Sequence, residues 1–117
     1  MFEIEDIRQW RGRDVIDPSG GKIGPLEAVY VDTLTDQPSF ATVRVGLPTR
    51  QRLVFVPLAG CTLGPDHLRV AHDKKQVKGA PGIDTNGELF AEAEPEVFAY
   101  YRLPYRAAPD ERLLARR

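Results

Sequence analysis

The residues best able to do chemistry are an oxygen-rich loop, two histidines, one cysteine and two neighbouring aspartates. In the loop Asp84–Glu88 (DTNGE), oxygen-bearing side chains alternate around a glycine, which is the donor pattern of a Ca²⁺ site. A complete calcium-binding loop has about 12 residues and ends in a bidentate glutamate, and this one stops short. We therefore expect an ordinary Asx turn here and no metal site.

Neither histidine has the surroundings of a ligand or a general base. His67 and His72 are five residues apart, which places them on opposite faces of an extended chain, so we expect both at the surface. Cys61 has no neighbouring cation, so we expect a small buried hydrophobe. Asp14 and Asp17 lie beside a turn, where paired carboxylates are common. No nucleophile elbow, P-loop or dinucleotide-binding turn is present. The sequence thus predicts no catalytic, cofactor-binding or metal-binding residue, no cofactor, and a protein that is not an enzyme.

Six basic residues would merge into a patch if the segments that carry them are neighbours in the fold. They are Arg50, Arg52, Arg69, Lys74, Lys75 and Lys78. Such a patch could hold phosphates, but exposed aromatic side chains that would stack on bases are not interleaved with it. We therefore expect a solvated basic face and no nucleic acid as partner.

Five aromatic residues near the C-terminal end could form an interface. They are Phe90, Phe98, Tyr100, Tyr101 and Tyr105. One interpretation is that a helix folds back over the chain's own sheet, with Val97, Phe98 and Tyr101 facing inward. The other is that this helix meets a second copy of the protein, because aromatic residues are enriched in interface cores. The first is favoured for the three inward residues, whereas for Tyr100 a partner surface and solvent remain equally open.

Length and charge restrict the class of protein further. The chain has 117 residues, of which 16 are Lys or Arg and 17 are Asp or Glu, so it fits one domain without a strongly cationic field. A single cysteine excludes an internal disulfide. The first residues lack the apolar stretch of a signal peptide, and no run approaches the roughly 18 apolar residues of a membrane span. We expect a cytoplasmic protein without a membrane partner.

Short apolar runs separated by Gly, Pro, Asp and Ser predict a small β-domain in the first two thirds of the chain. The expected strands are 13–17, 22–32, 39–47, 52–58, 61–63 and 67–71. In the second strand the apolar residues change face, which predicts a bulge or bend near Gly24–Glu27. Phe40 falls on the polar face of the third strand, where we expect it to cover the exterior.

The composition changes beyond Ala71. The polar segment 73–82 predicts one helical turn and a loop, and Val97, Phe98 and Tyr101 suit a helix over about 92–103 with one buried stripe. The helix dipole favours the acidic residues Glu92, Glu94 and Glu96 at its start, and Leu103-Pro104 ends the helix. We expect the basic tail 106–117 to be frayed or weakly helical.

Three segments together resemble the PRC-barrel family. They are Trp10–Gly24 (WRGRDVIDPSGGKIG), Glu27–Asp32 (EAVYVD) and Val54–Leu58 (VFVPL). The later segments Val77–Pro81, Gly87–Leu89 and Tyr100–Tyr105 are similar to the extension of stand-alone bacterial members, whose helix ends in Tyr-Tyr-Gly where this chain has Arg102. The resemblance implies a mainly β fold: a small PRC-type β-barrel over 8–71, then an extension over 72–117 with one helix.

The resemblance also implies an interaction module, because family members occur in the photosynthetic reaction-centre H subunit and in a ribosome-maturation factor. We therefore expect a non-enzymatic protein-interaction or scaffold module that self-associates as a homodimer, with an unidentified protein as a further partner. The alternative is an RNA- or ribosome-associated accessory protein. A small hydrolase is the third hypothesis and requires a pocket with a titratable pair.

Overall fold

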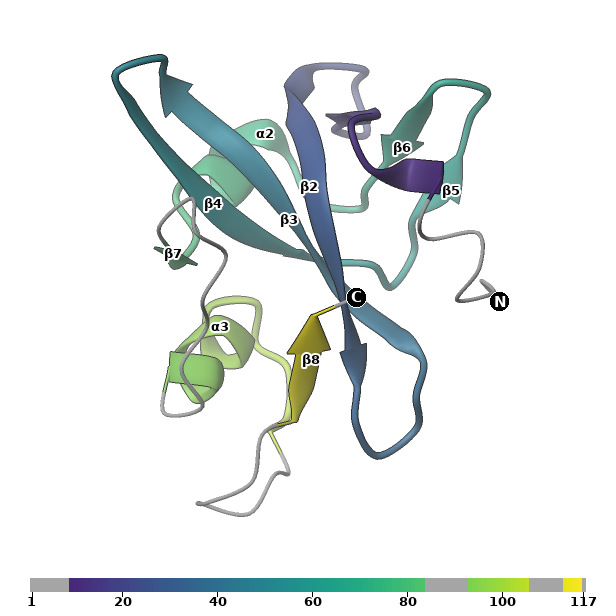
Figure 1. The fold of residues 1–117 in the computed structure, drawn as a ribbon, viewed down its shortest axis with the longest axis vertical. Helices are drawn as coiled ribbons and strands as arrows, with labels where there is room; N and C mark the ends of the chain where they lie inside the picture. The colour runs from purple at the N-terminus through teal and green to yellow at the C-terminus, as the bar shows by residue number, and fades with distance from the viewer. Residues whose placement is uncertain (1–8, 84–92, 106–112, 117) are drawn as a thin grey trace.

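The computed structural model describes residues 9–83, 93–105 and 113–116 and shows a mainly β domain with two short helices (Figure 1). The strands are β1 (Asp14–Ile16), β2 (Lys22–Asp32), β3 (Pro38–Leu47), β4 (Arg50–Pro57), β5 (Thr62–Leu63), β6 (His67–Arg69), β7 (Gly82–Ile83) and β8 (Leu114–Arg116). The helices are α2 (Lys74–Lys78) and α3 (Glu94–Tyr100). The predicted class, mainly β with a C-terminal helix, is confirmed.

The strands form one bent sheet in the order β5-β6-β1-β2-β3-β4-β7, and β8 pairs with β2 outside this path. Among the described strands every pairing is antiparallel except that of β1 with β6. The end strands β5 and β7 do not pair with each other, so the sheet is strongly curved but not closed. In Figure 1, β2 runs through the centre and takes part in both halves of the sheet.

The bend predicted in the second strand is confirmed by two breaks in the register of β2. Val15 pairs with Gly24 whereas Ile16 pairs with Lys22, and on the other edge Leu26 pairs with Val43 whereas Ala28 pairs with Thr42. Each break leaves one residue of β2 without an opposite partner, which bends the strand. The Gly24 position lies against the backbone carbonyl of Arg44, where a β-carbon would not fit. Gly24 thus lets the two halves of the sheet approach closely.

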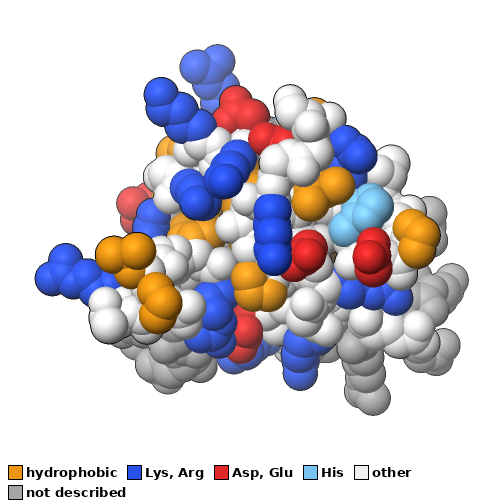
Figure 2. All heavy atoms as spheres, turned by 90° about the horizontal axis from the view of Figure 1, so that it is seen from above, with side chains coloured by type: hydrophobic (Ala, Val, Ile, Leu, Met, Phe, Trp, Pro, Cys, Tyr) orange, Lys and Arg blue, Asp and Glu red, His pale blue; other side chains and the backbone are white. Residues whose placement is uncertain are grey.

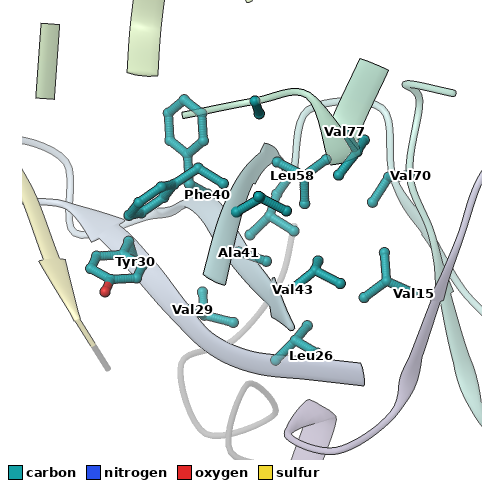
Figure 3. Packing of buried hydrophobic residues seen from close by; sticks show 14 of the residues in the cluster. Val15, Leu26, Val29, Tyr30, Phe40, Ala41, Val43, Leu58, Val70 and Val77 are labelled. Atoms are coloured by element: carbon teal, nitrogen blue, oxygen red, sulfur yellow. The ribbon is translucent and has the colours of Figure 1, made fainter. Parts of the chain in front are cut away.

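The concave side of the sheet holds an aliphatic core (Figure 3). Its members come from β1 to β4, from β6 and the segment after it, from the β4–β5 loop and from α2, and include Val15, Leu26, Val29, Ala41, Val43, Leu58, Val70 and Val77. Val77 is fully buried, so α2 plugs this side of the sheet. Leu68 and Val70 are buried while His67 and Arg69 are partly exposed, as the alternation predicts.

Phe40 lies on the opposite face from Ala41, but this face is not the exterior that the sequence predicts for it. Phe40 is fully buried because α3 covers it: its ring centroid is 5.0 Å from that of Phe98 and 6.3 Å from that of Tyr101. The strand therefore has an apolar residue on both faces here.

Helix α3 is shorter at its C-terminus than the predicted span of about 92–103. After Tyr100 the chain turns through Arg102, which adopts a left-handed φ of 57°. The N–H of Arg102 donates to the carbonyl of Ala99 and that of Leu103 to the carbonyl of Phe98, which together make a Schellman motif. Arg102 thus takes the backbone conformation for which glycine is usually required.

The expectation of a frayed or weakly helical tail is wrong for its last described residues. Leu114–Arg116 form β8, paired antiparallel with Tyr30–Asp32 of β2, and Leu113 and Leu114 are buried. Leu113 and Leu114 lie between β2 and α3. Burial of both side chains favours an ordered strand over a frayed end.

Candidate functional site

Two of the predicted features lie outside the described residues: the loop Asp84–Glu88 and the aromatic residue Phe90. In the part of the chain that the structure describes, no group of three or more His, Cys, Asp or Glu side chains is placed to hold a metal ion. No helix of that part is both long and apolar enough to cross a membrane.

Both histidines and the cysteine are partly exposed and have local contacts. The Nδ1 atom of His67 lies 3.3 Å from the carboxylate of Asp66. The Nδ1 atom of His72 lies 3.1 Å from Oε1 of Gln76, and its ring packs against that of Tyr101. Cys61 packs against the core, and its partial burial raises the pKa of the thiol, which opposes thiolate chemistry. His72 therefore belongs to the contact between α2 and the end of α3, and His67 lies beside the β5–β6 turn.

Asp17, directly after β1, has little exposed surface, and its carboxylate organises the turn into β2. Its Oδ1 accepts hydrogen bonds from the backbone N–H groups of Ser19 (3.0 Å) and Gly21 (2.7 Å). Its Oδ2 accepts one from the N–H of Lys74 (3.1 Å), at the start of α2. The bond from Gly21, with those from Lys74 and Ser19, lowers the pKa of Asp17 against the opposing effect of burial. The carboxylate is ionised and joins the β1–β2 turn to α2.

Glu94, in the first turn of α3, is a second buried carboxylate, for which the sequence indicated only a favourable interaction with the helix dipole. Its Oε1 accepts hydrogen bonds from the hydroxyl of Tyr105 (2.7 Å) and the N–H of Leu113 (2.8 Å), and its Oε2 accepts one from the N–H of Leu114 (3.1 Å). The signal was present in the spacing, because Glu94 precedes Val97, Phe98 and Tyr101 by three, four and seven residues and so shares their buried face.

The structure separates the described aromatic residues into buried and exposed ones. Phe98 and Tyr101 face inward with Val97, as predicted, and the hydroxyl of Tyr101 donates to the carbonyl of Phe55 at 2.6 Å. Tyr100 is 36% exposed, and its hydroxyl donates to the carbonyl of Gln76 at 2.6 Å. Among the described members of the aromatic set, Tyr100 and the partly buried Tyr105 are the ones that keep exposed surface for a partner.

The predicted basic patch is only partly assembled: three lysines lie on α2, and the two arginines Arg52 and Arg69 already bind backbone carbonyls. The guanidinium of Arg52 donates to the carbonyls of Lys78 (2.7 Å) and Ala80 (3.2 Å), and that of Arg69 donates to Pro18 (2.9 Å). Arg50 is exposed two residues before Arg52 on β4. In Figure 2, which looks onto the top of Figure 1, Lys and Arg side chains are interspersed with acidic and hydrophobic ones.

The three lysines share one shallow hollow, which we call the lysine hollow. It has a volume of about 460 Å³ and is lined by Asp17, Asp73, Lys74, Lys75 and Lys78. Asp73 accepts a hydrogen bond from the N–H of Gln76 and caps α2. The acidic members of this hollow therefore hold backbone groups in place.

A second hollow, which we call the apolar hollow, opens where α3 and the C-terminal segment meet the β2–β3 hairpin. Its volume is about 250 Å³, and it is lined by Asp32, Leu34, Thr35, Phe98, Pro104 and Leu113. The side chain of Leu34, at its rim, is 65% exposed. A second leucine, Leu47, lies at the other end of β3, outside the lining of this hollow, and is 69% exposed. No sequence pattern indicated this hollow, because three segments that are distant along the chain form it.

The structure is a small β-domain: a curved open sheet with α2 against its concave side and α3 over the opposite face. Its carboxylates Asp17 and Glu94 accept hydrogen bonds from its own backbone. The model of the PRC-barrel domain family matches residues 2–77, a span that extends beyond the range 8–71 taken from the motifs. Because this match covers more than half of the chain, the protein belongs to the PRC-barrel family. No curated protein matches the chain.

Proposed function

We propose that this PRC-barrel protein is a non-enzymatic interaction module that associates with a second copy of itself. The observation that carries the proposal is the placement of the two most exposed large apolar side chains among the described residues. Leu34, within the β2–β3 turn, and Leu47, the last residue of β3, are both more than half exposed. An exposed apolar side chain that adjoins further apolar surface favours association, and Leu34 adjoins Phe98, Pro104 and Leu113 in the apolar hollow.

The polar groups of the domain support the same proposal. The carboxylates of Asp17 and Glu94 each accept backbone hydrogen bonds, and the hydroxyl of Tyr101 donates to a backbone carbonyl. A general acid or base must exchange a proton with a substrate, whereas these oxygen atoms are already engaged in hydrogen bonds within the fold. These groups instead hold elements of the fold together, which favours a scaffold over a catalyst.

The mass of the full chain in solution tests self-association. We expect light scattering at micromolar concentration to give a mass above the 13.1 kDa of one chain, and the mass to fall on dilution. A constant mass of one chain over the whole concentration range would contradict the proposal.

A second candidate, an RNA- or ribosome-associated accessory protein, is favoured by one observation, the three lysines around the lysine hollow. Phosphate contacts would make such binding strongly dependent on salt. Titration with a labelled single-stranded RNA tests this candidate. Binding that weakens with salt and is lost in the triple variant Lys74→Glu, Lys75→Glu, Lys78→Glu would support it, whereas no binding at low salt would exclude it.

The proposal places the protein in the cytoplasm, where thiols stay reduced. The single cysteine, Cys61, has no partner cysteine in the chain and packs partly against the core, which suits such a compartment. Fractionation of cells that express the tagged chain tests the location, and recovery in a membrane or secreted fraction would contradict it.

A further inference from the structure

We propose that the hairpin end bearing Leu47 in one copy inserts into the apolar hollow beside Leu34 in a second copy. This inference rests on the proposed function and names the surfaces that would carry self-association. The two surfaces lie at opposite ends of β3, since Leu47 is its last residue and Leu34 lies in the turn before it (Figure 1).

A single chain cannot bury its own Leu47 in its own apolar hollow. Strand β3 has ten residues, and at about 3.3 Å per residue it separates its two ends by about 30 Å. The hairpin end therefore cannot reach the hollow of its own chain, and a second molecule is required.

The size and the apolar lining of the hollow suit an aliphatic side chain. The apolar hollow has a volume of about 250 Å³, which is below the roughly 300–1,000 Å³ of a typical small-molecule pocket and suits an aliphatic side chain. Phe98, Pro104 and Leu113 supply an apolar lining, and Leu34 stands at its rim. Leu47, on a hairpin that projects from the sheet, offers a side chain of matching chemistry.

The charges of the two surfaces are also complementary. Leu47 pairs across the hairpin with Arg50, so both side chains lie on the same face of the β3–β4 ribbon. Asp32 is the charged member of the described lining of the apolar hollow, and its carboxylate accepts backbone hydrogen bonds from Leu34 and Thr35. Insertion of Leu47 would bring the cation of Arg50 toward the anion of Asp32.

Each copy carries one hairpin end and one apolar hollow. If the β3 strands of two copies run antiparallel, the hairpin end of each copy can enter the hollow of the other. Such an arrangement closes into a two-fold dimer, which is the commonest form of soluble homo-oligomer. The geometry thus predicts a dimer held by two equivalent contacts.

Paired substitutions test this inference. We expect both Leu47→Arg and Leu34→Arg to weaken self-association about tenfold or more, because each places a charge in an apolar contact. Both positions are well exposed in one chain, so circular dichroism should show unchanged folding. Leu63→Arg is the matched control, since Leu63 is 41% exposed on β5, and it should leave association unchanged.

Mixing the two variants gives the decisive measurement. A mixed dimer keeps one intact contact, the Leu47 end of the Leu34→Arg copy in the unaltered hollow of the Leu47→Arg copy. We expect fluorescence energy transfer between differently labelled variants to appear in the mixture at concentrations where neither variant pairs with itself.

The failing outcomes can be told apart. If the unaltered chain associates and only one of the two variants weakens it, or neither does, the contact proposed here is wrong and self-association stands. Loss of association in both variants without recovery in the mixture also overturns this contact. If the unaltered chain stays a single copy at all concentrations, the inference and the proposed self-association both fail. A different protein that binds a monomeric chain through Leu47 would replace the second copy as occupant.

Discussion

The carboxylate of Glu94 accepts a hydrogen bond of 3.1 Å from the backbone N–H of Leu114, so the first turn of α3 holds the first residue of the C-terminal strand. The other oxygen of Glu94 binds the hydroxyl of Tyr105 and the N–H of Leu113. One buried carboxylate thus connects α3, the segment after it, and β8, which in turn pairs with β2.

We expect Glu94→Ala to destabilise the protein by about 2–4 kcal/mol, because it leaves buried N–H groups without acceptors. Glu94→Gln should cost less, since one carbonyl oxygen remains. Chemical denaturation measures both. The exposed residue Glu96 in the same turn is the control, and Glu96→Ala should cost at most about 1 kcal/mol through the helix dipole. Equal losses at the two positions would contradict the role assigned to Glu94.

Arg102 occupies a left-handed position that glycine adopts without strain. We expect Arg102→Gly to stabilise the protein by about 0.5–1 kcal/mol, because the Schellman motif at the end of α3 then forms without the steric cost of a β-carbon. Arg102→Ala keeps the β-carbon and should give no such gain. Thermal unfolding of the two variants separates the backbone effect from the loss of the guanidinium, and a gain shared by both would argue against it.

The strands could be predicted because their signal is local. Lys22–Asp32 was expected and observed with the same bounds, and its bend followed from the apolar residues that change face. Strand β8 could not be predicted in this way, because it has three residues and its order depends on Tyr30–Asp32 and Glu94, both distant along the chain. Phe40 was assigned to an exterior for the same reason, since its cover comes from α3.

The candidate site was less accessible to sequence reasoning than the fold. Charge alone led us to assign Glu94 to the helix dipole, although its spacing from Val97 and Tyr101 placed it on the buried face. The apolar hollow joins the β2–β3 turn to Phe98 and Leu113, and that proximity exists only after the chain has folded.

The lowered pKa of Asp17 predicts that the protein loses stability in acid. Its pKa is lowered below the ordinary value of 3.8 by the hydrogen bond from Gly21 and by those from Lys74 and Ser19. The unfolded chain therefore binds this proton more readily, and the stability from Asp17 is complete above pH 3.8 and lost as the pH falls through the lower folded value.

We expect Asp17→Asn to be less stable than the unaltered chain at neutral pH, because its amide cannot accept from Lys74, Ser19 and Gly21 as the carboxylate does. The gap between the two proteins should narrow as the solution is acidified below pH 3.8. Urea denaturation at a series of pH values measures it, and a gap that stays constant or widens in acid would show that the carboxylate charge is not the cause.

Tyr101 gives the opposite dependence on pH. Burial of its hydroxyl, with a smaller effect of Tyr100, raises its pKa above the ordinary value of 10.0, because the phenolate would be poorly solvated. The unfolded chain loses this proton first, so the stability from Tyr101 is complete below pH 10.0 and is lost as the pH rises beyond it.

Tyr101→Phe should cost about 1 kcal/mol at neutral pH, where it removes the hydrogen bond to Phe55. It should also make the protein less sensitive to alkali. Denaturation of Tyr101→Phe and of the control Tyr100→Phe, at neutral pH and above pH 10.0, measures both effects. If Tyr100→Phe protects equally well against alkali, the buried hydroxyl of Tyr101 is not responsible.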